Sequence, residues 1–179
     1  GRGQAGAKNT CLRYMTGEYV TWVDSDDVVD DNYLEKLLEV QEKTGADIVR
    51  CVRKYIRNGT VYFVKGYENG FINTDGIFDL SLETALKNRL SNYLGIIEFW
   101  GELIPRRLYK GFNLSQGMIY EDQGNKFKLY LQSKKNVVVL DQLYSYRIHE
   151  ESIMDTQRKG RSNLTESLKD LQICIFNWN

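Results

Sequence analysis

Apolar residues near the start of the chain recur at the spacing of an α-helix. They are Ala7, Cys11, Leu12 and Met15. This spacing predicts a helix over residues 5–16, with Gly17 where it is expected to stop. The next apolar run, residues 19–23, is short and rich in β-branched and aromatic side chains, and a run of carboxylates follows it. We expect a buried central strand that ends in negative charge.

A second helical pattern follows the carboxylates. Its apolar face is formed by Tyr33, Leu34, Leu37, Leu38 and Val40. Asp30 or Asp31 is placed to cap its first turn, and Gly45 is placed to end it. Two strand-like runs then flank Asn58-Gly59, a strong signal for an antiparallel hairpin.

The rest of the chain mixes helical and strand-like patterns. A further helix is marked by Leu82, Leu86, Leu90 and Tyr93. A strand-like segment broken at Pro105 follows, and Asp122 is placed to cap a helix that carries Phe127, Tyr130 and Leu131. Residues 137–140 and 143–147 look like strands, and residues 163–178 form an amphipathic pattern. This order predicts an α/β sandwich on a partly parallel sheet, with a site at the carboxyl ends of strands.

Composition narrows the class of protein. With 179 residues, 42% of them hydrophobic, the chain suits one soluble domain. Its 24 basic and 24 acidic residues provide no net charge that would attract nucleic acid. Three scattered cysteines favour reduced, mostly buried thiols in a cytoplasmic protein. The glycine-rich opening has no strand before it, so we expect an N-terminal part to be missing.

The acidic run after the first strand is the main chemical signal. Carboxylates crowded at the end of a buried strand repel one another unless a cation lies among them. Asp24 and Asp26, separated by one residue, could both reach one Mg²⁺ or Mn²⁺ ion, whose open positions suit phosphate oxygens. Asp27, Asp30 and Asp31 could instead be the acidic first turn of a helix, and we adopt that interpretation for the last two.

The acidic run can also be compared with two other acidic motifs, the EF-hand loop and a phosphatase motif. Val28 and Val29 stand where an EF-hand loop needs a ligand and a glycine, which excludes that calcium site. An apolar strand followed by D-x-D-x-V also matches the nucleophile motif of phosphatases of the haloacid dehalogenase type. That alternative stays open, although no later threonine or serine and lysine pair supports it.

Three segments together resemble glycosyltransferase family 2, the inverting GT-A enzymes that use nucleotide-sugars. The first is GQAGAKNTCLRYMTGEYVTWVDSDDVVDDNYLEKL, similar to the family's glycine, A-R-N, G-E-Y and D-S-D-D pattern. The second is FWGELIPRRLYKGFNLSQGMIYEDQGNKF, similar to its tryptophan and Glu-Asp acceptor-side block. The third is LYSYRIHEESI, similar to its Y-x-Y-R segment. They extend from about residue 3 to residue 153.

The resemblance implies a role for each matching residue on the donor side. Asp24 and Asp26 match the pair that holds the ribose and the metal-bound diphosphate, with Asp26 the more direct ligand. The further residues that it implies in donor or metal binding are Lys8, Asn9, Arg147 and His149. His149 falls where some members have another metal or diphosphate ligand.

On the acceptor side, Asp122 of the Glu121-Asp122 pair matches the catalytic base that deprotonates the acceptor hydroxyl. Independently, in-line displacement at a sugar carbon needs one base and charge neutralisation on the leaving group. Asp122 could equally be a plain helix cap. Trp100 could stack on a sugar or pack in the core.

The sequence departs from the family pattern in places. Lys8 replaces an arginine, and Glu102 replaces a lysine or asparagine of the acceptor block. The resemblance implies an opening part that reads the nucleobase, and we expect that part to be missing here. We therefore expect an N-terminally truncated GT-A-like domain: residues 1–45 for nucleotide and metal, 46–155 for the acceptor, and 156–179 as a loop and helix.

The resemblance predicts an enzyme that moves a sugar from a nucleotide-sugar, a UDP-sugar by preference, onto a glycan or lipid-linked glycan in surface polysaccharide synthesis, with Mn²⁺ or Mg²⁺. We expect a cytoplasmic protein, peripheral at the membrane at most. A non-catalytic glycan-binding or assembly domain is the alternative from another class.

Overall fold

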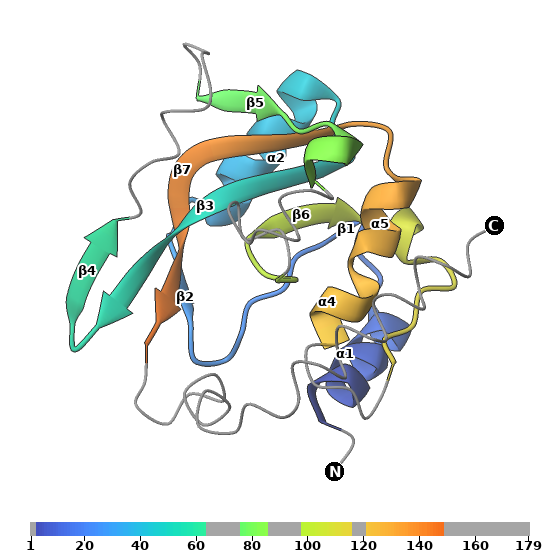
Figure 1. Cartoon of the computed structure of the whole chain (residues 1–179), viewed down its shortest axis with the longest axis horizontal. Coiled ribbons are helices and arrows are strands. Elements are labelled where there is room, and N and C mark those ends of the chain that lie inside the picture. The colour runs from blue at the N-terminus through green and yellow to red at the C-terminus, as the bar shows by residue number, and fades with distance from the viewer. Residues whose placement is uncertain (1–2, 64–75, 86–97, 116–120, 149–179) are drawn as a thin grey trace.

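The computed structural model describes residues 3–63, 76–85, 98–115 and 121–148 (Figure 1). The helices are α1 (Gly3–Tyr14), α2 (Tyr33–Thr44), α4 (Glu121–Asn125), α5 (Phe127–Gln132) and the 3-10 helix η2 (Arg106–Tyr109). The strands are β1 (Tyr19–Val20), β2 (Val28–Val29), β3 (Ile48–Arg57), β4 (Thr60–Phe63), β5 (Ile77–Asp79), β6 (Glu102–Pro105) and β7 (Asn136–Arg147).

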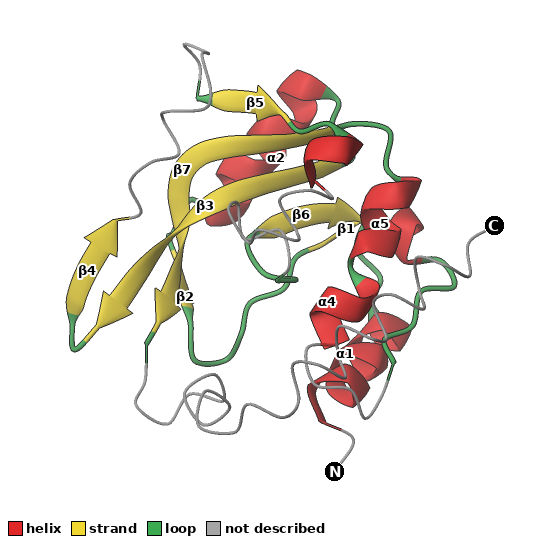
Figure 2. Ribbon diagram, in the orientation of Figure 1, coloured by secondary structure: helices red, strands yellow, loops and turns green. Residues whose placement is uncertain are grey.

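One mixed sheet organises the described residues. Its order is β1-β6-β3-β7-β2, with β4 paired to β3 and β5 paired to β7. The two long strands β3 and β7 run parallel, and the other pairs between named strands are antiparallel. Figure 2 shows these two strands curving together through the centre of the sheet. The expectation of a partly parallel sheet flanked by helices is confirmed.

The two faces of the sheet carry separate cores because side chains alternate along β3. Val49 and Cys51 face the side on which α2 packs through Tyr33, Leu37 and Val40. Ile48 and Val52 face the other side, where the core is completed by side chains from α1, η2 and α5. Arg50 has the same parity as Ile48 and Val52, and it too is buried.

Strand β7 is longer than the sequence indicated. Residues 137–140 and 143–147 were expected as two strands, but they belong to one strand with an irregularity in its pairing to β3. The register shifts between Cys51 and Arg53 of β3, as at a β-bulge. The polar Asp141 and Gln142 made the sequence look like a turn at this irregularity.

The position of β1 corrects another expectation. This strand has two residues, pairs with β6 antiparallel and stands at the end of the strand order, so it is not a central strand in the described sheet. Its side chains are half-buried. Beyond it, Trp22 forms an isolated parallel bridge with Trp100, which continues the segment toward the acidic run.

Helix α2 follows the predicted pattern at its end and departs from it at its start. Gly45 has φ 66° and its N–H donates to Gln41 O, as a left-handed C-cap does. Asn32, rather than Asp30 or Asp31, occupies the N-cap. Leu34 and Leu38 are 57% and 40% exposed, so the buried stripe is narrower than expected.

Of the other local predictions, some are confirmed and some are wrong. The hairpin between β3 and β4 is confirmed, with positive φ at Asn58 and Gly59. Strand β6 ends at Pro105, as expected. In α1 the buried positions include Ala5 and Asn9, whereas the predicted Ala7 and Cys11 are exposed.

Several expectations fall outside the described residues: the end of the helix near Leu90, Cys174 and the amphipathic pattern of residues 163–178. Cys51 is buried, as predicted for a thiol of this chain. Within the described ranges, no helix is both long and apolar enough to cross a membrane.

Candidate functional site

Asp24 and Asp26 lie on one tight turn between β1 and β2. The N–H of Asp27 donates to the carbonyl oxygen of Asp24 at 3.1 Å, which closes a four-residue turn. Asp24 is half-buried and Asp26 is exposed. The two carboxylates therefore belong to a turn after the strand, and they do not lie along the strand itself. We call residues 24–27 the acidic turn.

Strand β7 holds the acidic turn through Tyr144. The Tyr144 hydroxyl accepts a hydrogen bond from the Asp24 N–H at 3.1 Å and donates one to Asp27 Oδ2 at 2.7 Å. The backbone N–H of Arg147 donates to Asp27 Oδ1 at 2.9 Å. Both oxygens of Asp27 are thus engaged, so this carboxylate fixes the turn. The Y-x-Y-R segment contained the signal for Tyr144, but its role in holding the turn was not predicted.

The electrostatics of the turn follow from partial burial. Desolvation raises the pKa of Asp27, the hydrogen bonds from Arg147 and Tyr144 oppose that rise, and the charges of Asp26 and Asp24 add to it. Burial also raises the pKa of the Tyr144 hydroxyl, which stays protonated and able to donate. The negative charges of Asp24 and Asp26 therefore act on the Asp27 carboxylate within this turn.

Asp30 has a different role from the one expected. Its carboxylate pairs with the Lys54 ammonium at 2.6 Å, and its N–H donates to the Leu143 carbonyl. It is therefore not an acid of the first turn of α2, where Glu35 is the acidic residue. Asp31 is exposed in the turn before α2. Asp30 thus fixes the segment before α2 to β3 through Lys54 and to β7 through Leu143.

Asp26 is the carboxylate of the acidic turn that is most available to a ligand. Within the described ranges, no hydrogen bond or ion pair engages its side chain. The same ranges contain no group of three or more His, Cys, Asp or Glu side chains placed to hold a metal. His149, the predicted additional ligand, lies outside them. Asp24 and Asp26 thus offer the hard oxygen donors that Mg²⁺ or Mn²⁺ prefers, and an ion there would need further ligands from water or phosphate.

The two predicted residues of α1 are occupied in the protein. Asn9 is 5% exposed, and its amide accepts from the Leu114 N–H at 2.8 Å and donates to the Leu114 carbonyl at 2.9 Å. It therefore clasps the loop that leads toward α4. The Lys8 ammonium lies 5.9 Å from the Phe99 ring centroid.

Asp122 lies in the first turn of α4. It is the second described residue of that helix, and its carbonyl oxygen accepts from the Lys126 N–H at 2.9 Å. It is therefore not the cap of α5, which begins after Lys126. The Asp122 side chain is half-buried, and Glu121 opens the described part of α4. Arg147 is exposed at the end of β7, next to the acidic turn.

A second group of charged side chains is buried in the protein. Glu102 is 0% exposed, and its Oε1 accepts from Arg50 Nη1 at 2.6 Å and from the Tyr130 hydroxyl at 2.6 Å. The Lys126 ammonium lies 2.8 Å from the same oxygen and donates to the Glu98 carbonyl. Sequence reasoning noted Glu102 only as a departure from the family, yet it is the centre of this cluster.

Burial sets the protonation of the cluster. Desolvation lowers the pKa of Lys126 to about 8, against the opposing effect of Glu102. For Arg50, burial acts to lower the pKa, but Glu102, Tyr130 and Glu98 together raise it, so the guanidinium remains charged. Burial also raises the pKa of Tyr130, which keeps its proton for Glu102.

Trp100 connects the buried cluster to the acidic turn. Its ring is 6% exposed and stacks on Tyr144, with ring centroids 4.5 Å apart and planes 14° apart. The Arg50 guanidinium carbon lies 5.7 Å from the centroid of the Trp100 ring. Core packing, rather than sugar stacking, is therefore the role that the structure shows for this tryptophan.

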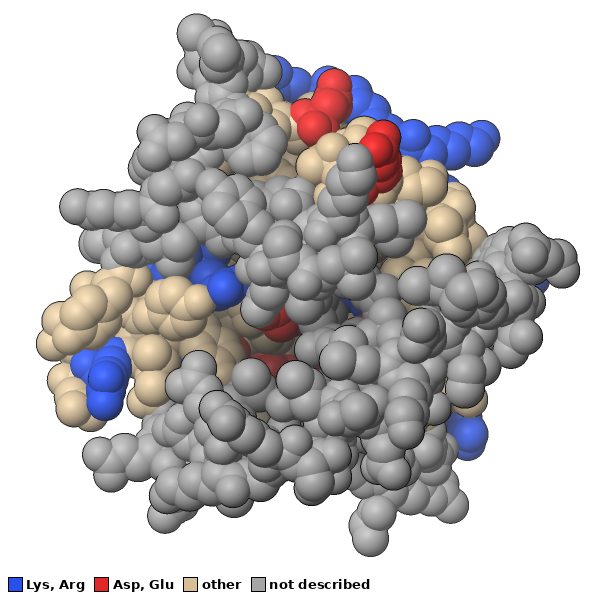
Figure 3. All heavy atoms as spheres, viewed as in Figure 1, with Lys and Arg blue, Asp and Glu red and all other residues tan. Residues whose placement is uncertain are grey.

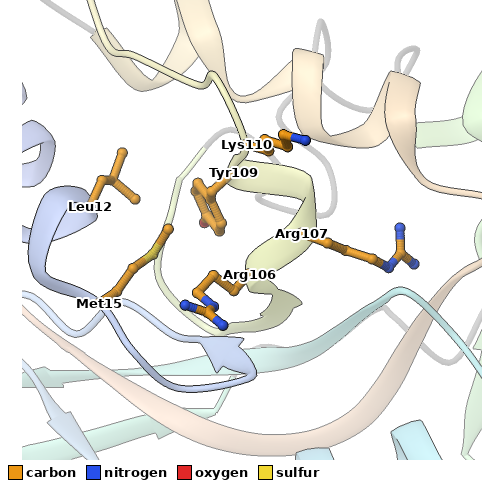
Figure 4. Close-up of a pocket in the computed structure, with 6 residues that line it drawn as sticks. All are labelled: Leu12, Met15, Arg106, Arg107, Tyr109 and Lys110. Carbon is orange, nitrogen blue, oxygen red and sulfur yellow. The ribbon is translucent and has the colours of Figure 1, made fainter.

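Figure 3 shows atoms of Asp and Glu residues near the centre of one face of the molecule and again near its upper edge. A separate shallow pocket of about 390 Å³ lies at the end of α1 and along η2 (Figure 4). It is lined by Leu12, Met15, Arg106, Arg107, Tyr109 and Lys110. Among the described residues, none that the sequence predicts to bind donor, metal or acceptor lines this pocket.

Comparison with known proteins identifies the class. Residues 1–109 match the family model "Glycosyl transferase family 2". Two curated relatives from Streptococcus pneumoniae serotype 4 align over 159 residues each. "Glycosyltransferase GlyA" is 34% identical, over 84% of this chain and 22% of that protein. "Glycosyltransferase GlyG" is 30% identical, over 87% of this chain and 52% of that protein.

A solved structure agrees at the level of fold. S. aureus TarS, residues 1–349 in complex with UDP-GlcNAc, superposes with a TM-score of 0.65 and 20% identity, over 87% of this chain and 42% of that one. The fold is that of the GT-A glycosyltransferases.

The chain belongs to glycosyltransferase family 2. It spans 22% and 52% of the length of the two curated relatives described above. The family match removes the basis for the phosphatase interpretation of Asp24 and Asp26.

Proposed function

We propose that the protein transfers a glycosyl group from a nucleotide-sugar, a UDP-sugar by preference, to a hydroxyl group of a glycan acceptor. Family membership and two relatives named glycosyltransferases support the reaction class. The TarS structure in complex with UDP-GlcNAc supports the donor class. The observation that carries the proposal is the acidic turn, because β7 holds its backbone while the Asp26 carboxylate stays exposed.

On the donor side, Asp24 and Asp26 would hold a Mn²⁺ or Mg²⁺ ion together with the diphosphate, and His149 is a further proposed ligand. The bound ion would neutralise the charge of the departing nucleoside diphosphate. Asp27 contributes by keeping the turn closed, since both of its oxygens accept hydrogen bonds from β7. Lys8, Asn9 and Arg147 are proposed to line the same nucleotide side.

On the acceptor side, Asp122 is the proposed base, with Glu121 beside it. The acceptor hydroxyl oxygen forms a bond to the anomeric carbon while the bond from that carbon to the diphosphate oxygen breaks. The hydroxyl proton passes to the Asp122 carboxylate, and the electron pair leaves with the diphosphate. One displacement inverts the anomeric centre, so no covalent intermediate on the protein is needed.

The proposed setting is synthesis of a surface polysaccharide on the cytoplasmic side of the membrane. The acceptor would be a growing glycan or a lipid-linked glycan. Residues 163–178, whose sequence is amphipathic, are the segment proposed to touch the membrane surface or to pack on the domain.

The test is transfer of labelled sugar from a panel of nucleotide-sugars by the full-length protein with Mn²⁺ present. Asp122→Asn removes the proposed base and is expected to lower kcat by about two to four orders of magnitude, the usual contribution of a positioned base. Asp141→Asn is the matched control, because Asp141 is exposed on β7 and has no hydrogen bond or ion pair with Asp24, Asp26 or Asp122 within the described part of the chain. It is expected to retain wild-type turnover.

Two outcomes would contradict this assignment. If Asp122→Asn turns over as fast as Asp141→Asn, the base is another group. If the wild-type protein binds glycan acceptors but neither binds nor hydrolyses any nucleotide-sugar, the non-catalytic alternative replaces the proposed function.

A further inference from the structure

A continuous series of side-chain contacts connects the acidic turn to the helix that carries Asp122. It is formed by Tyr144, Trp100, Arg50, Glu102 and Lys126, which we call the bridging network. The network crosses β7, the segment before β6, β3, β6 and the junction of α4 with α5.

At the end near the proposed nucleotide-sugar site, one atom of the network contacts both the first and the last residue of the acidic turn. The Tyr144 hydroxyl is the acceptor for the Asp24 N–H and the donor to Asp27 Oδ2. A phenylalanine at this position would keep the ring stack on Trp100 but lose both hydrogen bonds. The geometry of the turn thus depends on one hydroxyl oxygen, which joins the Asp24 backbone to the Asp27 carboxylate.

In the middle, the network relies on packed rings and a buried cation. Trp100 lies against Tyr144 at a centroid distance of 4.5 Å, and Arg50 lies 5.7 Å from Trp100. Arg50 is 2% exposed and is fixed by the 2.6 Å bond to Glu102. Side chains this well packed have little freedom to shift independently.

At its acceptor end, the network fixes α4 by one lysine. The Lys126 ammonium is held by Glu102 and by the Glu98 carbonyl, while the Lys126 N–H donates to the Asp122 carbonyl one turn earlier. The side chain therefore ties α4 to the sheet at the turn that carries Asp122. A shift of Lys126 would shift the Asp122 backbone with it.

The cluster is poorly suited to serve stability alone. Burying two cations and a carboxylate costs desolvation energy, and apolar residues of similar volume often replace buried ion pairs without loss. Glu102 Oε2 is buried and has no hydrogen-bond partner among the described residues, which adds to the cost. Such charges fix relative geometry more strictly than apolar packing would, and here they lie between the two halves of the proposed site.

We propose that the bridging network positions the acidic turn and Asp122 relative to each other, with Tyr144 as the positioning residue for the donor turn and Lys126 as that for the proposed base. This inference rests on the proposed function. It adds two residues that act by holding the segments that carry the proposed ligands and the proposed base.

The test compares Tyr144→Phe with Tyr33→Phe in the full-length protein. Tyr33 is a matched control, since it is also buried and its hydroxyl makes a 2.7 Å hydrogen bond, but to Thr21 rather than to the acidic turn. We expect Tyr144→Phe to weaken binding of UDP with Mn²⁺ about tenfold, consistent with the loss of two hydrogen bonds, and Tyr33→Phe to change it less than about twofold. Equal affinity in the two variants would overturn the donor half of the inference.

The acceptor half is tested by Lys126→Met, which keeps the length of the side chain and removes its charge. We expect kcat to fall about tenfold while KM for the donor stays within about twofold, because only the proposed base is displaced. In the double variant Tyr144→Phe/Lys126→Met, the loss of kcat/KM should be smaller than the product of the single losses, as for residues of one network. A strictly multiplicative loss, or a Lys126→Met protein with unchanged kcat, would overturn it.

Amide hydrogen exchange separates this inference from the proposed function. In Tyr144→Phe, the amides of Asp24 and Arg147 should exchange about tenfold faster than in Tyr33→Phe, even in a protein that transfers no sugar. If the wild-type protein is inactive but exchange changes as expected, the function fails and the positioning stands. If exchange is the same in both variants, the positioning fails.

Discussion

Two groups of carboxylates occupy opposite environments in this protein. Around Glu102, the acid is fully buried and lies within 2.8 Å of two cationic groups. In the acidic turn, Asp26 is exposed, and its charge and that of Asp24 help to raise the pKa of Asp27. The first group is neutralised by the fold. The second is held in shape by β7, and its Asp26 carboxylate is exposed.

This difference separates a structural acid from a ligand-binding acid more clearly than the sequence motif does. A carboxylate that is fully buried beside its own cations is closed to a ligand from solution, whereas crowded and exposed carboxylates gain from binding a cation. Asp27 and Asp30 show the boundary within one segment: both look like motif residues, yet both are used by β7 or Lys54. Asp26 is the member that remains available.

The largest expected effect is on stability, and it comes from making the same chemical change in both groups. Glu102→Gln leaves Arg50 and Lys126 buried without the Glu102 carboxylate and should lower the free energy of unfolding by about 3–5 kcal/mol. Asp26→Asn removes like-charge repulsion from an exposed turn and should leave the unfolding free energy unchanged or slightly raised. Urea unfolding of the two variants measures both. Equal destabilisation by the two substitutions would contradict the distinction.

A smaller effect sharpens the description of the buried group. Lys126 is faced by Glu98, Glu102, Arg50 and Tyr130, and burial lowers its pKa to about 8. Between about pH 8 and pH 10.5 the unfolded chain keeps the Lys126 proton and the folded protein has lost it, so rising pH favours folding through this group. Below about pH 8 the full cost of burying the charge is present.

The expected result concerns a difference between two proteins, because other groups also titrate in this range. The unfolding free energy of the wild type minus that of Lys126→Met should rise as pH increases from about 8 to 10, as linkage requires. Groups common to both proteins cancel in this difference. A difference that is flat across this window would mean that Lys126 does not titrate there.

The position of the acidic turn could be predicted because its signals are local. A short apolar strand followed by D-S-D-D marks the turn without knowledge of the fold, and Asn58-Gly59 and Gly45 mark positions that need positive φ. The family resemblance also predicted the GT-A fold from a few spaced motifs. Such features depend on neighbours in the sequence.

The partners of the charged residues could not be predicted, because they depend on contacts between distant segments. Asp27 meets Tyr144 across 117 residues, and Asn9 meets Leu114 across 105. Local patterns likewise did not predict that Asp30 pairs with Lys54 and does not cap α2. They also did not predict that Glu102 is buried beside Lys126. The register shift that joins the two halves of β7 is also a property of its pairing with β3.

The most direct test of the central claim is calorimetric titration of the full-length protein with UDP in the presence of Mn²⁺. Asp26→Asn is compared with Asp31→Asn, a neighbouring exposed aspartate outside the acidic turn. If the acidic turn binds the diphosphate through a metal ion, binding should require Mn²⁺, and Asp26→Asn should weaken it at least about tenfold, by the loss of one charged ligand. Asp31→Asn should bind as the wild type does. Binding that is insensitive to chelator, or equal in the two variants, would contradict the claim.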